Sequence, residues 1–291
     1  MATEASKASA GSAWPLLQFF LLAFALMWVC FFTVALAPIP AGTPLGRLLL
    51  LLGAFAPCLA ALWVTARAEG GAGVRALLRG VIKWRVAARW YVFAASFTVI
   101  VKLAVAVIYR VAMGAWPRFG ADPWYMIPLA IAFSTPFQVG EEIGWRGYAL
   151  PRLAARFGLA RASLLLGGVW GCWHLPQFFI RDADTYRQSF WVFVIGVTSL
   201  SVVLAWLWER TGRGLLLPML LHAAWNNSKD IVPSGVAGGT ATFGLHASLV
   251  SWLTLAILGV CAAFFLLDMP KRRTGGNSFV SVSQSYRSPL G

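Results

Sequence analysis

Eight apolar runs occupy most of this 291-residue chain. They lie at about residues 15–37, 45–65, 90–112, 124–150, 162–180, 189–208, 214–233 and 247–267. About 20 helical residues cross the hydrocarbon core of a bilayer. Only 12% of the residues are charged, against about 25% in soluble domains. The sequence therefore predicts an all-α, polytopic membrane protein with about eight transmembrane helices in residues 14–268. The polar segments 1–13 and 269–291 are predicted to be disordered tails.

The net charge of +14 is distributed according to these runs. If the N-terminus is cytoplasmic, the cytoplasmic segments hold 17 of the 24 basic residues and the opposite side holds 6. Cytoplasmic loops of membrane proteins carry such an excess of Lys and Arg. The asymmetry predicts both termini in the cytoplasm and attributes the charge to topology, with no nucleic acid as a partner. The high Ala, Arg, Trp and Gly content favours a bacterial inner membrane.

Polar side chains interrupt three of the apolar runs. Glu141 and Glu142 lie in the fourth run, His174 in the fifth, and His222 with Asn226 in the seventh. An ionisable group at membrane depth costs about 2.5–3.5 kcal/mol on insertion scales, so a chain rarely keeps several without a use. At 1.5 Å per residue, these side chains lie roughly 12–19 Å from the cytoplasmic ends of their runs. A shared depth predicts that they form one site.

The spacing of the charged residues suggests different roles for the two acids. Glu142 precedes Arg146 by four residues, so an ion pair can form on one helix face. Glu141 is rotated by about 100° from Glu142. It is then free to face a cavity and act as a general base. The alternative is that both acids merely pair with Arg146 and Arg152 at the membrane interface.

The histidines have informative neighbours. His222 and Asn226 are four residues apart, so both side chains point to one helix face and can donate hydrogen bonds to one oxygen. Pro176 biases the residue before it away from helical geometry. The helix that carries His174 is therefore predicted to kink or end just past it and to line a cavity. Between the second and third runs, the basic stretch from Val74 to Trp90 predicts an amphipathic helix on the cytoplasmic surface.

Three of these patterns resemble the signatures of the CPBP family, which includes the type II CAAX prenyl endopeptidases and the bacterial Abi-type immunity proteins. They are Glu-Glu-x-x-x-Arg at 141–146, aromatic-x-x-x-His at 170–174 and His-x-x-x-Asn at 222–226. The resemblance is good over about residues 120–233. The chain departs from it at Trp170, where the family more often has Phe.

The resemblance implies an intramembrane endopeptidase that acts on a membrane-associated or peptide substrate. Glu141 and His174 would activate a water, and His222 and Asn226 would stabilise the oxyanion. Glu142 would set the helix through Arg146. The resemblance implies no metal or other cofactor, and it does not select the substrate.

Three alternatives stay open at this stage. A zinc-dependent protease would bind Zn²⁺ through Glu141, His174 and His222. Glutamate and histidine at mid-membrane also build the proton relays of proton-coupled transporters. The third alternative is a non-catalytic immunity or scaffold protein. The four cysteines lie in apolar runs without a CxxC pair and are expected to be packing residues.

Overall fold

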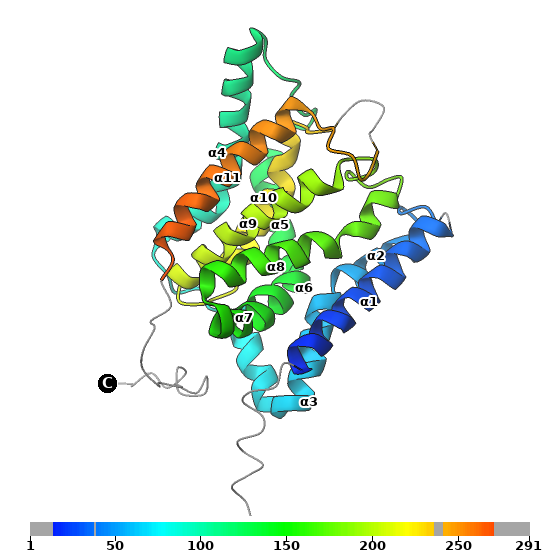
Figure 1. The fold of residues 1–291 in the computed structure, drawn as a ribbon, viewed down its shortest axis with the longest axis vertical. Helices are drawn as coiled ribbons and strands as arrows, with labels where there is room; N and C mark the ends of the chain where they lie inside the picture. Colours follow the sequence, from blue (N-terminus) through cyan, green and yellow to red (C-terminus); the bar gives the residue numbers. More distant parts are fainter. Residues whose placement is uncertain (1–13, 38, 236–240, 271–291) are drawn as a thin grey trace, which may run out of the picture.

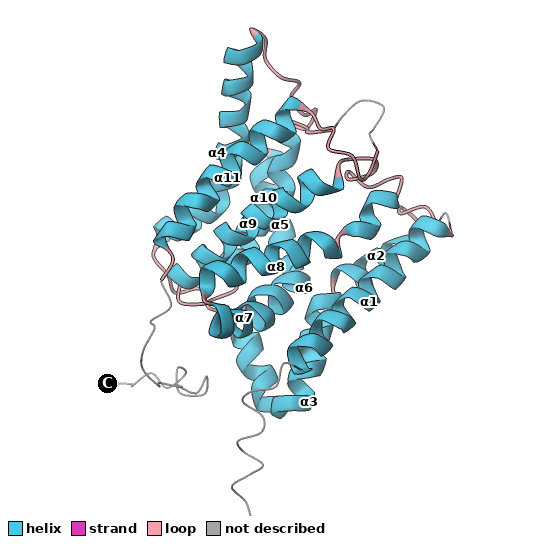
Figure 2. Cartoon of the chain, viewed as in Figure 1, coloured by secondary structure: helices cyan, strands magenta, loops and turns pink. Residues whose placement is uncertain are grey.

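The computed structural model describes residues 14–37, 39–235 and 241–270. These residues form helices joined by loops and contain no strand (Figure 2), as the sequence predicts for an all-α protein. The predicted tails at 1–13 and 269–291 lie outside the described residues, except for Met269 and Pro270. The elements are α1 (Trp14–Leu36), α2 (Pro44–Ala54), α3 (Ala56–Arg79), α4 (Ala88–Met113), α5 (Met126–Ser134), η1 (Thr135–Gln138), α6 (Val139–Glu142), η2 (Ile143–Ala149), α7 (Leu150–Phe157), α8 (Leu159–Trp173), η3 (Leu175–Phe179), α9 (Phe190–Arg210), α10 (Leu216–Ser228), η4 (Lys229–Ile231) and α11 (Leu249–Asp268).

Four helices are long and apolar enough to cross a membrane, namely α1, α4, α9 and α11. A fifth candidate is the pair α2 and α3, which bends by 50° at its break. Each predicted apolar run contains helical structure, but the count of eight spans is not confirmed. The three runs that carry the polar residues fold as short or broken helices. Residues 126–157, for example, form a chain of α, 3-10, α, π and α segments.

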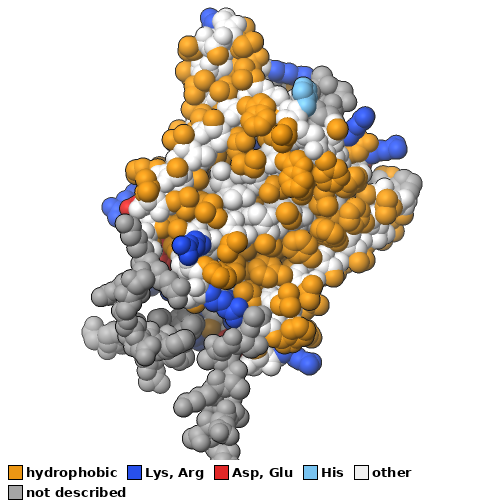
Figure 3. Space-filling view, viewed as in Figure 1, with side chains coloured by type: hydrophobic (Ala, Val, Ile, Leu, Met, Phe, Trp, Pro, Cys, Tyr) orange, Lys and Arg blue, Asp and Glu red, His pale blue; other side chains and the backbone are white. Residues whose placement is uncertain are grey.

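The helices pack into a bundle in which α8 lies against α9, α9 against α11, α4 against α10 and α1 against α3 (Figure 1). In Figure 1 the start of α1 lies near the bottom of the bundle, α7 lies beside it to the left, and the end of α11 lies at the left edge. Apolar side chains cover much of the face shown in Figure 3, and Lys and Arg gather toward its margins. Exposed apolar side chains of this kind suit contact with lipid.

The region predicted as one amphipathic helix differs from that prediction. Helix α3 ends at Arg79 after a break at Gly70, whose φ is 65°, and α4 begins at Ala88. Residues 80–87 form turns and a loop instead of a helix. The Gly80 carbonyl accepts a hydrogen bond from the Leu215 amide (2.8 Å), and Lys83 donates to the Gly212 carbonyl. These long-range contacts hold the segment against the turn between α9 and α10, and so override its helical pattern.

Glycines allow the helices of the site to approach closely. A Cβ at Gly144 would lie 2.5–2.7 Å from Pro57, and a Cβ at Gly140 would lie 2.8 Å from the Phe55 ring. In α8, a Cβ at Gly167 would lie 2.6 Å from the Thr198 Cα of α9. Small residues spaced four apart are typical of packed membrane helices. They bring the helices that carry Glu141, Glu142 and His174 close to their neighbours.

Candidate active site

The buried centre of the site is the carboxylate of Glu142, which is fully inaccessible. Its Oε1 lies 3.0 Å from Nη1 of Arg146, which is also fully buried. The same oxygen lies 2.8 Å from Nδ1 of His222 on α10. The ion pair expected from the four-residue spacing is present, and a histidine from a distant segment joins it. Oε2 of Glu142 and Nε and Nη2 of Arg146 are buried without a hydrogen-bond partner among the described residues.

Glu141 faces a different environment from that of its neighbour. It is partly exposed, and its Oε2 accepts hydrogen bonds from two indoles, Trp170 Nε1 at 2.7 Å and Trp145 Nε1 at 3.3 Å. The two acids therefore have separate partners. The alternative that both pair with Arg146 and Arg152 does not describe this arrangement, because Arg152 pairs with Glu69 (2.6 Å).

His174 lies at the end of α8, where the sequence predicted a kink or an end. It caps the helix, and the chain continues as the 3-10 helix η3. Its Nδ1 donates to the Trp170 carbonyl (2.8 Å), and its ring lies edge-on to Trp173 with a centroid separation of 4.8 Å. The Trp170 ring lies 5.8 Å from the ring of His174 and 5.2 Å from that of His222, and its indole N–H donates to Glu141. The three helical segments thus bring their ionisable groups into one region.

Asn226 lies one turn beyond His222 on α10. Its side chain is exposed, and its Nδ2 lies 3.5 Å from Oε1 of Gln138 in η1. Helix α10 thus presents one buried and one exposed member of the predicted pair.

Sequence reasoning missed Trp145 and Gln138 as neighbours of the site, and it treated Trp170 only as an aromatic position. Trp145 lies four residues after Glu141, which is the same spacing that linked Glu142 to Arg146. That signal was present in the sequence. The contacts of Trp170 and Gln138 join segments 29 and 88 residues apart, and no local pattern could reveal them.

The side chains that the alternative mechanism would use for zinc are Glu141, His174 and His222. Within the described part of the chain, no three His, Cys, Asp or Glu residues are arranged to hold a metal ion. The Nδ1 of His222 is bonded to Glu142, and Oε2 of Glu141 is bonded to two indoles.

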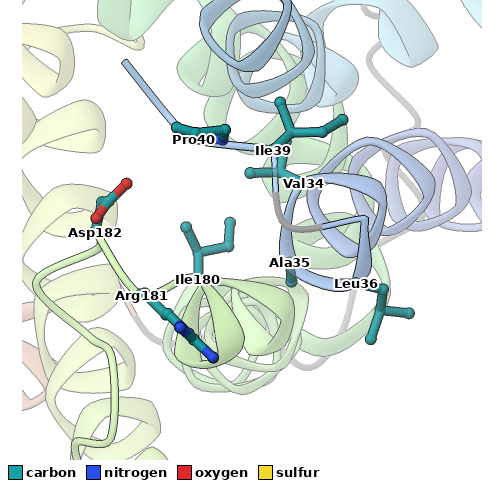
Figure 4. Close-up of a pocket in the computed structure, with 8 residues that line it drawn as sticks. All are labelled: Val34, Ala35, Leu36, Ile39, Pro40, Ile180, Arg181 and Asp182. Carbon is teal, nitrogen blue, oxygen red and sulfur yellow. The ribbon is translucent and has the colours of Figure 1, made fainter. Parts of the chain in front are cut away.

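A pocket of about 450 Å³ lies elsewhere, between the end of α1 and residues 180–182 (Figure 4), and its lining contains none of the predicted site residues.

Comparison with known proteins bears on these motifs. Residues 122–228 match the Rce1-like family model, described as type II CAAX prenyl endopeptidase. The matched segment contains all three motifs. Over this segment the chain is similar to the CPBP family. The chain is also similar to CAAX prenyl protease 2 of Methanococcus maripaludis, to which it is 26% identical over 153 residues. That alignment covers 47% of this chain and 56% of the relative, so the chain spans little more than half of the relative's length.

Proposed function

We propose that this chain is an intramembrane endopeptidase in which Glu141 and His174 activate a water for attack on a peptide carbonyl. The observation that carries the proposal is the gathering of the three family motifs, from separate helices, around Glu141, His174 and His222. His222 reaches Glu142, and Trp170 contacts Glu141, His174 and His222.

The hydrogen bonds of the site suit the activation of a water. The Nδ1–H of His174 is used on the Trp170 carbonyl, so Nε2 of the neutral ring is an acceptor. Both indole bonds to Glu141 end on Oε2. A water can therefore donate one hydrogen to Nε2 of His174 and the other to Oε1 of Glu141. Glu141 takes the proton as the C–O bond forms, and that proton then passes to the amine that leaves when the C–N bond breaks.

The oxyanion would be stabilised from α10 by His222 and Asn226. Because Nδ1 of His222 donates to Glu142, its Nε2 donates only when the ring is a doubly protonated imidazolium. The charges of Glu141 and Glu142 would then balance those of Arg146 and His222. A neutral set suits a buried site, since an uncompensated charge there is costly. Glu142 thus positions His222 as well as Arg146.

The substrate is proposed as a peptide or protein at the bilayer. The relative's name suggests prenylated C-terminal CAAX peptides as one class to test. We also propose that the protein lies in a bacterial inner membrane with both termini in the cytoplasm. Its biological role would be either peptide processing or immunity. We rank a zinc-dependent mechanism second because the described residues contain no group of three His, Cys, Asp or Glu side chains placed to hold a metal ion. No contact of the site favours a transporter or scaffold.

The test compares membranes that contain the wild-type protein with membranes that contain Glu141→Gln, using mass spectrometry of peptide termini. We expect new termini only with the wild type, and purified wild-type protein in liposomes should cleave a peptide that spans such a site. Prenylated and unprenylated versions of the peptide then identify the substrate class. Glu209→Gln is the matched control because it alters an exposed pair with Arg213 at the end of α9. Identical termini from wild type and Glu141→Gln would refute the proposal.

A further inference from the structure

Trp170 contacts most of the predicted site residues. It is 2% exposed, and its indole N–H donates to Oε2 of Glu141 at 2.7 Å. Its backbone carbonyl accepts from His174, and its ring lies 4.2 Å from the guanidinium carbon of Arg146. The ring of His222 meets it edge-on at 5.2 Å. One tryptophan therefore contacts four of the six predicted site residues.

We propose that Trp170 is a positioning residue, whose indole N–H holds the Glu141 carboxylate in the orientation that activates the water. This inference rests on the function proposed above and adds a residue to it. A phenylalanine at this position, as the resemblance leads one to expect, has a ring but no donor. The indole N–H is thus a feature of this chain's own site.

The geometry assigns a specific task to the N–H. A carboxylate on a flexible side chain loses rotamer freedom only when its partners fix it. Trp170 and Trp145 approach from different helical segments and donate to the same oxygen. The carboxylate is held at Oε2, and among the described residues no hydrogen bond ends on Oε1. The longer bond from Trp145, at 3.3 Å, makes it the weaker of the two donors.

The test separates the N–H from the ring by two substitutions at one position. Trp170→Phe removes the N–H and shrinks the ring, whereas β-(3-benzothienyl)alanine keeps the bicyclic shape and replaces N–H by sulfur. Both variants lose a hydrogen bond to a charged group. We therefore expect kcat to fall by about 10- to 100-fold in both, with KM within about 2-fold of the wild-type value. Trp145→Phe should show a smaller fall. An isostere with wild-type kcat would overturn the proposal, because ring shape alone would then suffice.

Trp206→Phe is the matched control. Its Nε1 also donates to a carboxylate, that of Asp268 at 2.8 Å, near the ends of α9 and α11. This variant loses the same type of bond and should keep the wild-type kcat, even if its melting temperature falls.

A second measurement does not depend on turnover. Dicyclohexylcarbodiimide modifies protonated carboxyl groups in apolar surroundings, and mass spectrometry locates the modified residue. Without the Trp170 donor the Glu141 carboxyl group is no longer held by its stronger partner, so Glu141 should be labelled several-fold faster in both Trp170 variants than in the wild type or Trp206→Phe. Equal labelling rates would contradict the proposed bond.

If Glu141→Gln keeps wild-type turnover, the proposed function fails. If Glu141→Gln is inactive but both Trp170 variants resemble wild type, only the assignment to Trp170 fails.

Discussion

At the scale of single residues, Glu142 compensates the buried charge of the site. It accepts from both Arg146 and His222, and each of the three is at least 97% buried. Glu142→Gln would leave the arginine without its counter-ion in a medium that solvates charge poorly. We expect a loss of about 3–5 kcal/mol in unfolding free energy, measured by denaturation in detergent. Glu209→Gln, which breaks an exposed pair, should cost about 1 kcal/mol or less. Equal losses of unfolding free energy in the two variants would show that the buried pair of Glu142 stabilises the protein no more than the exposed pair of Glu209.

His222 and Asn226 are predicted to act mainly on rate. Removal of one oxyanion donor typically lowers kcat by about 10²- to 10³-fold. His222→Ala and Asn226→Ala should therefore reduce kcat with little change in KM. Asn227→Ala is the control for α10, since Asn227 bonds Ser134 and its own helix. A rise in KM with unchanged kcat would assign the pair to substrate binding instead.

The residue scale also shows what could be read from sequence. The bond between Glu142 and Arg146 follows from helix periodicity, because both lie within one short segment. The links from Glu142 to His222 and from Glu141 to Trp170 depend on how separate helices pack. Shared membrane depth predicted that these helices meet, but periodicity alone could not select the partner atoms.

At the scale of elements, the closeness of α8 and α9 depends on Gly167. A Cβ there would lie 2.6 Å from a backbone atom of α9, whereas a Cβ at the adjacent Gly168 meets nothing within 4 Å. Gly167→Ala should destabilise the protein by about 1–3 kcal/mol because the backbone must shift. Gly168→Ala should be neutral or stabilising, since Ala favours helix over Gly. Thermal unfolding of the two variants tests this, and equal melting temperatures would contradict the packing.

The broken helices explain why the number of spans was harder to predict than their positions. Hydropathy locates apolar segments well, as it does for α1, α4, α9 and α11. Hydropathy does not show where an apolar segment changes from α-helix to 3-10 helix, π-helix or loop. In the fourth run, Pro136 lies in the 3-10 helix η1, and seven residues of π-helix follow Glu142. Such π segments occur frequently at functional sites.

At the scale of the whole molecule, the positive-inside pattern predicts which end of the bundle faces the cytoplasm. Single cysteines at the exposed residues Trp116 and Phe243 should react with an impermeant thiol reagent from outside the cell. A cysteine at the exposed Ile82 should react only after the membrane is opened. The background is a variant without the four native cysteines. Labelling of Trp116→Cys from the cytoplasmic side alone would overturn the orientation.

The central claim is that Glu141 and His174, without zinc, activate the water that cleaves a peptide. The most direct measurement is the turnover of a confirmed substrate by purified protein after prolonged dialysis against phenanthroline, with zinc counted by elemental analysis. A zinc-bound water has its pKa lowered to about 7 by the metal, whereas a carboxylate must take the proton itself. We predict well under one zinc per chain, full turnover by dialysed wild type and none by Glu141→Gln. Stoichiometric zinc, with turnover lost on dialysis and restored by added zinc, would contradict the account.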